Sequence, residues 1–291
     1  MLPRRNFKAG ALALAASSIA GKPQAAEPAR VDCHTHVFVR GLPHAANARY
    51  VPDYDASYEE LLAIAEANGI GRIVIEQPSF LGFDNSYLFC ALRAKPERFR
   101  GVPWIAPRTS AAEWDEIARL GVRGLRFPIF GLPTPNWADY KETFAEVKRR
   151  DWTLDLYVEC RRLPEILPML LESGAKVIVP HFGMFDPRLG PMRDPGFKVL
   201  LEAAKTGRVY VKLCGAYRVG LEGAREAAPL LLAAFGTSHL VWASDWPHTN
   251  TDLSRTTTYP KTLQWLADWV PDEATSRKIL VDTPRRLYGF S

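Results

Sequence analysis

The sequence lacks the spacing that a cysteine-based site would need, because no two of its four cysteines form a CxxC pair. Cys33, Cys90, Cys160 and Cys214 lie in or beside apolar runs, which predicts buried thiols and argues against a disulfide framework. No GxGxxG motif follows the first predicted strand, so a dinucleotide-binding sheet is not indicated. The chain also lacks an internal linker and a low-complexity segment, which predicts one folded domain.

The apolar run nearest the N-terminus, Ala9–Ala20, is too short for a stable membrane span. It follows Arg4-Arg5-Asn6-Phe7-Lys8, an arrangement that resembles a twin-arginine export signal. We therefore expect residues 1–26 to be a signal peptide and residues 27–291 to be the folded domain. This predicts a periplasmic or secreted protein; an amphipathic or disordered start to the chain is the alternative.

An excess of positive charge is also missing once this leader is set aside. The leader carries four cations and no acid, so removing it lowers the formal net charge from +5 to +1. Binding to nucleic acid needs a clustered basic face, and the sequence offers none. We expect a small-molecule partner and no nucleic acid, and the sequence leaves the oligomeric state open.

Short apolar runs alternate with amphipathic stretches throughout residues 27–291, which predicts parallel strands covered by helices on both faces. Eight such units in about 250 residues are typical of an α/β protein with a (β/α)8 TIM barrel, here followed by C-terminal helices. We expect strands at Val31–His36, Arg72–Glu76, Gly101–Ile105, Val122–Phe127, Thr153–Val158, Lys176–His181, Val209–Leu213 and Leu240–Asp245. We expect helices at Tyr58–Asn68, Asn85–Ala94, Ala111–Leu120, Trp137–Arg150, Leu163–Ser173, Phe197–Thr206, Leu221–Phe235, Lys261–Trp269 and Asp272–Val281.

Polar residues close most of these apolar runs. Catalytic groups of TIM barrels lie at the carboxyl ends of strands and in the loops that follow. His34 and His36 share one side of the first strand because side chains alternate, although alone they could be surface histidines. The other polar residues at strand ends are Glu76, Gln77, Ser79, Arg126, Tyr157, Glu159, His181, Lys212, Arg218, Asp245 and His248. Together they predict a polar site on one rim of the barrel.

Three of the strand ends carry the blocks His34-Thr35-His36, Val179-Pro180-His181-Phe182-Gly183 and Ser244-Asp245-Trp246-Pro247-His248. Further blocks are Gly121-Val122-Arg123-Gly124-Leu125-Arg126-Phe127, Val211-Lys212-Leu213-Cys214-Gly215-Ala216 and Leu287-Tyr288-Gly289-Phe290. In this order they resemble the amidohydrolase superfamily, and within it the branch that contains 2-pyrone-4,6-dicarboxylate lactonase. The resemblance runs from about Val31 to the C-terminus and implies a hydrolase that opens a lactone ring.

Lactone hydrolysis needs a base for the attacking water and donors for the oxygen that becomes negative. We expect Asp245 to be the base, and His34, His36 and His181 to polarise the carbonyl group. A capping or ion-pair role is the alternative for Asp245. A core histidine bonded to backbone is the alternative for His181.

A binuclear metal site, which other members of the superfamily have, is not expected here. Those sites use a lysine or glutamate on the fourth strand and a histidine on the fifth, whereas these strands end with Arg126 and Tyr157. A guanidinium offers no lone pair to a metal. The sequence leaves open a site for one zinc ion at His34, His36 and Asp245. The resemblance implies a metal-independent enzyme, so we expect no cofactor.

Five residues stand where the lactonase branch holds the carboxylates of its substrate: Tyr50, Ser79, Arg126, Tyr157 and Arg218. The two arginines are suited to bidentate carboxylate binding, with surface ion pairing as the alternative. Leu132 stands where that branch has a further arginine. The resemblance thus implies an anionic lactone, which could be the pyrone, a sugar-acid lactone or a muconolactone-type ring.

Three other functions stay open. The first is a mononuclear zinc hydrolase or decarboxylase, which metal content would identify. The second is an isomerase of sugar-acid lactones, which would change ring size without taking up water. The third is a binding protein without catalysis, which the intact histidines and Asp245 argue against because a pure binder needs no base facing imidazoles.

Overall fold

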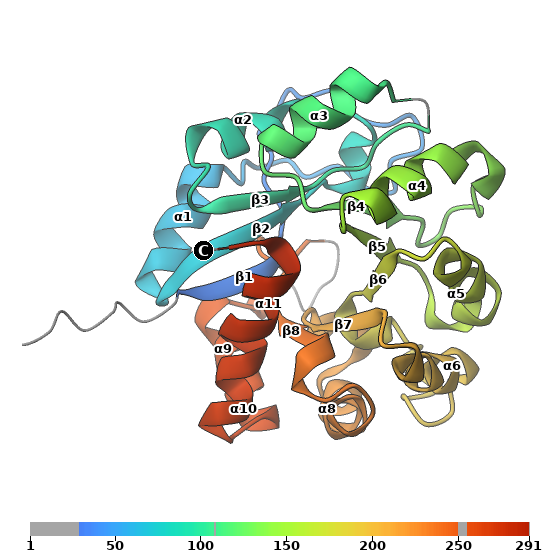
Figure 1. The fold of residues 1–291 in the computed structure, drawn as a ribbon. Helices are drawn as coiled ribbons and strands as arrows, with labels where there is room; N and C mark the ends of the chain where they lie inside the picture. Colours follow the sequence, from blue (N-terminus) through green and yellow to red (C-terminus); the bar gives the residue numbers. More distant parts are fainter. Residues whose placement is uncertain (1–28, 108, 250–254, 291) are drawn as a thin grey trace, which may run out of the picture.

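The computed structural model describes residues 29–107, 109–249 and 255–290, so the expected signal peptide at residues 1–26 lies outside it. Within this part of the chain, parallel strands alternate with helices, and the helices surround the strands (Figure 1). Each strand pairs with its neighbour in sequence in the orders β1-β2-β3 and β4-β5-β6-β7-β8. The strands are β1 (Arg30–Thr35), β2 (Ile70–Glu76), β3 (Phe99–Val102), β4 (Gly124–Pro128), β5 (Thr153–Tyr157), β6 (Lys176–Val179), β7 (Val209–Leu213) and β8 (Leu240–Trp242).

Backbone hydrogen bonds close these two groups of strands into a barrel. Where β3 meets β4, Arg123 N donates to Gly101 O at 3.0 Å. Where β1 meets β8, His36 N donates to Trp246 O at 2.9 Å and Asp245 N donates to His34 O at 3.0 Å. The predicted (β/α)8 TIM barrel is confirmed, and its second seam joins the expected histidines directly to the segment of Asp245.

The helices follow the strands in turn, and local sequence fixes several of their ends. Ser57, for example, caps the first helix through a reciprocal pair of hydrogen bonds with Glu60. The C-terminal helices are confirmed, and the last of them, Thr283–Tyr288, contacts β1 and β8 (Figure 1). The helices are α1 (Tyr58–Ala67), α2 (Ser86–Ala94), α3 (Ala111–Arg119), α4 (Lys141–Arg149), α5 (Leu163–Glu172), α6 (Pro195–Ala203), α7 (Ala216–Val219), α8 (Leu221–Phe235), α9 (Tyr259–Trp269), α10 (Glu273–Arg277) and α11 (Thr283–Tyr288).

Several elements differ from their predicted bounds: the eighth strand ends at Trp242 and not at Asp245, and the stretch Asp272–Val281 is α-helical only over Glu273–Arg277. The third strand ends at Val102 and not at Ile105, because Pro103 has no N–H to donate to a strand ladder. The stretch Trp137–Arg150 is not one helix: a 3₁₀ turn over Trp137–Tyr140 precedes α4.

Alternation along the strands separates two cores. On β5, Leu154 and Leu156 pack outward against the helices, whereas Asp155 points into the barrel toward Lys212 of β7. The apolar floor of the barrel interior is formed by Val31, Val74, Val102, Ile178, Tyr210 and Val241 together with Leu287, Tyr288 and Phe290 from the C-terminus. The strands thus carry an apolar layer near their starts and polar groups near their ends.

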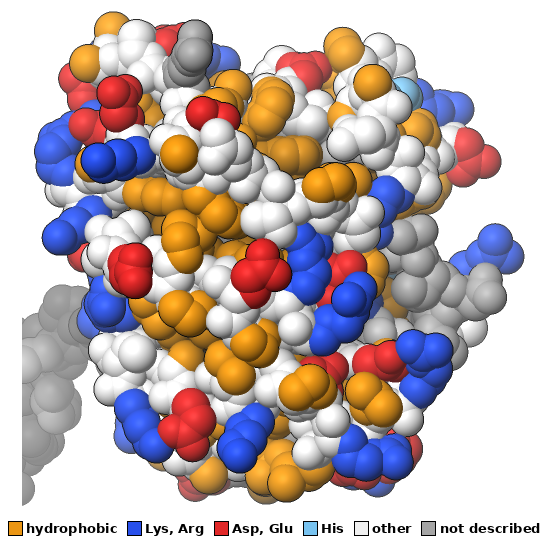
Figure 2. All heavy atoms as spheres, turned by 90° about the vertical axis from the view of Figure 1, so that its right-hand side faces the viewer, with side chains coloured by type: hydrophobic (Ala, Val, Ile, Leu, Met, Phe, Trp, Pro, Cys, Tyr) orange, Lys and Arg blue, Asp and Glu red, His pale blue; other side chains and the backbone are white. Residues whose placement is uncertain are grey.

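The surface carries charges of both signs. Over the face shown in Figure 2, acidic and basic side chains are interspersed with apolar ones, and neither sign gathers into one patch. Cys33, Cys160 and Cys214 are buried, but Cys90 is exposed on α2, so the prediction of a buried thiol is wrong at that position. Across residues 29–107, 109–249 and 255–290, no helix combines the length and apolar character that a membrane crossing requires.

Candidate active site

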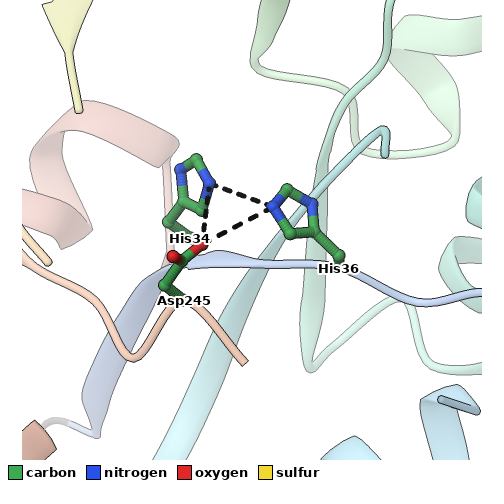
Figure 3. Close-up of side chains that lie close together, drawn as sticks. All are labelled: His34, His36 and Asp245. Carbon is green, nitrogen blue, oxygen red and sulfur yellow. Dashed lines mark hydrogen bonds and ion pairs between the residues drawn. The ribbon is translucent and has the colours of Figure 1, made fainter. Parts of the chain in front are cut away.

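Three side chains from the seam between β1 and β8 converge on one point (Figure 3). The Nε2 atoms of His34 and His36 lie 3.2 Å apart. Asp245 Oδ1 lies 3.5 Å from the first and 3.6 Å from the second of these nitrogens. All three side chains are buried, so the structure brings together three of the four residues expected to be catalytic.

A β-bulge in β1 sets the direction of His34. Asp32 pairs with Ile73 and Thr35 with Ile75, so β1 has one residue more than β2 between these pairs. Cys33 packs in the inner core, and its neighbour His34 also points inward, which strict alternation would not allow. Alternation alone puts the two histidines on one side, but that this side faces the interior depends on a bulge that the sequence pattern does not show.

Glu76 at the end of β2 fixes the hydrogen positions of both histidines. His36 Nδ1 donates to the backbone oxygen of Glu76 at 2.9 Å, and His34 Nδ1 lies 2.9 Å from the Glu76 carboxylate. In the neutral rings both Nε2 atoms then carry lone pairs. Burial lowers the pKa of His34 to about 3 even though Glu76 opposes this shift. Burial and Arg126 lower the pKa of His36, so both rings are neutral at pH 7.

Asp245 follows β8 in a left-handed backbone conformation with φ of 61°. Its Oδ2 accepts a hydrogen bond from Arg218 Nε at 2.8 Å and another from the Tyr217 hydroxyl. Its Oδ1 accepts no hydrogen bond from the described residues. Burial opposes ionisation, but Arg218 and the surrounding imidazoles hold the pKa of Asp245 well below its usual range. The residue is thus a carboxylate with one anchored oxygen and one free to accept a proton.

His181 follows β6 with φ of 55° and completes the predicted catalytic set. Its Nδ1 lies 3.2 Å from Cys214 Sγ and 3.9 Å from Asp245 Oδ2. Gly215 allows this approach, because a Cβ there would lie 2.5 Å from His181 Nδ1. Burial lowers the pKa of His181 well below its usual range, so the ring is neutral. When its Nδ1 accepts a hydrogen bond from the Cys214 thiol, His181 Nε2 carries the hydrogen that a substrate oxygen needs.

A buried set of charges supports the histidines from inside the barrel. Lys212 Nζ forms an ion pair with Asp155 at 2.6 Å, another with Glu76, and a hydrogen bond to Cys33 O at 2.8 Å. Arg126 Nε lies 3.1 Å from the second oxygen of Glu76. Although burial opposes its charge, the acids hold the pKa of Lys212 well above its usual range. Lys212 was expected on the rim, but it lies below it.

The five residues expected to bind substrate all line one pocket. Arg49 also lines the pocket and was not expected from the sequence, whereas Leu132 is not part of the lining. The complete lining is His36, Phe38, Arg49, Tyr50, Pro78, Ser79, Phe80, Arg126, Tyr157, His181, Arg218 and Thr249.

His34, His36 and Asp245 pass a geometric test for one metal ion. Ligand atoms about 2.0–2.1 Å from a tetrahedral zinc lie roughly 3.3–3.4 Å from one another. The three atoms here are 3.2, 3.5 and 3.6 Å apart. Each presents a lone pair, and the partners of both Nδ1 atoms are of the kind that orient metal-ligating histidines. The residues therefore fit a single divalent cation.

Comparison with known proteins places this geometry in a family. The family model described as amidohydrolase matches residues 31–290. A 4-sulfomuconolactone hydrolase from Rhizobium radiobacter is 30% identical over 270 residues, which is 89% of this chain and 89% of that protein.

Two solved structures share the fold over nearly their whole length. A protein from Pseudomonas putida, described as a 2-pyrone-4,6-dicarboxylic acid hydrolase, matches with a TM-score of 0.83 and 34% identity, covering 90% of this chain and 98% of that chain. A protein from Acinetobacter baumannii with the same description and with citric acid bound has a TM-score of 0.85 and 29% identity, covering 90% and 99%.

Proposed function

The chain belongs to the amidohydrolase family, and from this premise we propose that it hydrolyses a lactone that carries an anionic group. The observation that carries the proposal is the free Oδ1 of Asp245, a buried carboxylate oxygen beside an arginine-lined pocket. The relatives that act on sulfonated or carboxylated lactones support this substrate class, as does the neighbour that binds citric acid.

In this mechanism the two oxygens of Asp245 have different tasks. Oδ2 is held by Arg218 and Tyr217, so Oδ1 points at a fixed place where it can take the proton of an attacking water. His181 and the outer nitrogens of Arg126 or Arg218 can donate to the carbonyl oxygen as it becomes negative. His34 and His36 cannot donate in the same way, because their Nε2 atoms carry lone pairs while Nδ1 is bound at Glu76.

The lone pairs on the Nε2 atoms of His34 and His36 bear on whether the enzyme uses a metal ion. Three lone pairs that face one another repel unless a proton or a cation lies between them. Without a metal, a proton on one of the two rings would have to relieve this repulsion, whereas burial holds both rings neutral at pH 7. The second candidate mechanism uses one divalent ion, which His34, His36 and Asp245 would hold. Such an ion would supply Lewis-acid polarisation and activate water.

A panel of lactones with and without a carboxylate, assayed by proton release, tests the proposed function. Hydrolysis of an anionic lactone releases one proton per ring opened. An isomerase would change the ring size without release, and a binding protein would do neither. Elemental analysis of protein purified without chelator separates the two mechanisms when it is followed by chelation and readdition of zinc. Unchanged turnover in metal-free protein supports the metal-free mechanism.

A further inference from the structure

Three arginines line the pocket, and two of them are neutralised by an acid. Arg218 pairs with Asp245 at 2.8 Å, and Arg126 pairs with Glu76 at 3.1 Å. Arg49 forms no hydrogen bond or ion pair with any residue that the structure describes. The inner guanidinium groups are therefore compensated, and Arg49 carries unbalanced positive charge at the exposed edge of the pocket.

Aromatic rings from three loops or strand ends hold Arg49 in this place. Its Cζ lies 5.4 Å from the ring centre of Phe130, 5.9 Å from that of Tyr157 and 6.0 Å from that of Tyr50. The Phe130 and Tyr157 rings are stacked, with centroids 5.2 Å apart and planes 12° from parallel. A guanidinium that contacts aromatic rings makes no N–H···O bond to them, so the N–H groups of Arg49 stay available to an anion.

The aromatic platform also links Arg49 to the catalytic residues. Tyr157 packs edge-on against His181 with ring centres 5.3 Å apart. Arg126 lies 5.6 Å from the centre of the same tyrosine ring. Because Glu76 compensates Arg126, Arg49 is the guanidinium near this ring whose charge an incoming anion would balance. His36, His181 and Arg218 line the same pocket as Arg49, so one bound ring can contact both the catalytic side and Arg49.

We propose that Arg49 binds an anionic substituent, a carboxylate or a sulfonate, on the substrate edge away from the scissile carbonyl. The proposal rests on the proposed lactonase function and adds the residue that selects for negative charge at that edge. Arg49 comes from the loop between β1 and α1, so it supplies the pocket with a cation that the segment around Leu132 does not.

Kinetics of Arg49→Met on a matched pair of substrates test this assignment. The pair is an unsaturated five-membered lactone bearing one carboxylate and its methyl ester. We expect kcat/KM for the acid to fall about 5- to 30-fold, mainly through KM, because an exposed charge-assisted contact contributes less than a buried one. The ester should change less than about twofold. Arg49→Lys, which keeps the charge but loses the bidentate edge, should recover part of the loss.

Lys261→Met is the control, because Lys261 is another exposed cation over an aromatic ring, 5.9 Å from Trp265, and lies outside the pocket lining. It should leave both substrates unaffected. Equal losses on acid and ester in Arg49→Met, or equal effects of the two methionine variants, overturn the anion site while the lactonase function stands.

Binding of benzoate and benzamide, followed by saturation-transfer NMR, gives a readout that needs no turnover. We expect benzoate to bind wild-type protein better than benzamide, and Arg49→Met to remove this preference. If no lactone is hydrolysed but the preference depends on Arg49, the proposed function fails and the anion site stands. A preference that survives Arg49→Met overturns the anion site.

Discussion

Replacing Arg218 by methionine should damage the enzyme more generally than the sequence suggests. The Arg218 side chain is 9% exposed, its partner Asp245 is fully buried, and Nε lies 2.8 Å from Oδ2. Removing one member of a buried ion pair leaves the other charge uncompensated, which costs about 3–5 kcal/mol. Tyr217 still donates to the same oxygen, so we expect the lower end of this range, about 3 kcal/mol.

Chemical denaturation of a double-mutant cycle measures this interaction. The cycle compares wild type with Arg218→Met, Asp245→Asn and the double variant. Asparagine carries no charge to leave unpaired, so the double variant should be more stable than the sum of the single effects indicates, by about 1–3 kcal/mol.

The pH profile of the same variant gives a second readout. Without the guanidinium the pKa of Asp245 rises, because Arg218 is the main group that opposes its burial. The acid limb of kcat/KM should therefore move to higher pH, and both charged and neutral lactones should lose activity. Additivity within about 0.5 kcal/mol together with an unmoved acid limb would refute the pairing of Arg218 with the base.

Two further predictions address stability and export. Burial raises the pKa of Asp32 to about 6 despite hydrogen bonds from Ser244 and Tyr259, so the folded protein binds more protons than the unfolded chain between about pH 4 and 6. The stability that this proton provides is present below about pH 4 and should be lost as pH rises through about 6. At 1.36 kcal/mol per pKa unit the loss is roughly 3 kcal/mol. The unfolding free energy of wild type should therefore fall relative to that of Asp32→Asn across this range, and parallel curves would contradict the assignment. We also propose that residues 1–26 direct export, so a chain beginning at Glu27 should keep full activity. A reporter fused to the leader with Arg4→Lys and Arg5→Lys should stay inside the cell. Continued export of that reporter would show that the twin-arginine interpretation is wrong.

The strand pattern predicted the barrel because buried strands are short, apolar and bounded by turns, and this information is local. The bulge at Cys33–His34 is not local, since it depends on the register with β2. Of the charges that support the histidines, Asp155 was missed for the same reason. Asp155 is a single acid within an apolar strand, and only the fold shows that Lys212 of β7 lies 2.6 Å away. Arg49 lies in a long loop with no periodic pattern, so nothing in the sequence indicated that it lines the pocket.

Residue type and position predicted that Arg218 binds an anion, but not which anion it binds. The sequence indicated an anion-binding arginine, and the structure places that arginine in the pocket. Its Nε, however, is already bound to an anion within the protein, the carboxylate of Asp245. Position along the chain could not distinguish an arginine that binds substrate from one that orients the base, because both lie on the loop after β7.

Turnover by Asp245→Asn is the measurement that tests the central claim most directly. The amide keeps the shape of the carboxylate and can still accept the hydrogen bond from Arg218, but it cannot take a proton from water. On an anionic lactone we expect kcat to fall about 10²- to 10⁴-fold, as is typical when a general base is removed, while KM stays within a few-fold of wild type. A variant that keeps more than about a tenth of wild-type turnover would contradict the assignment of Asp245 as the base.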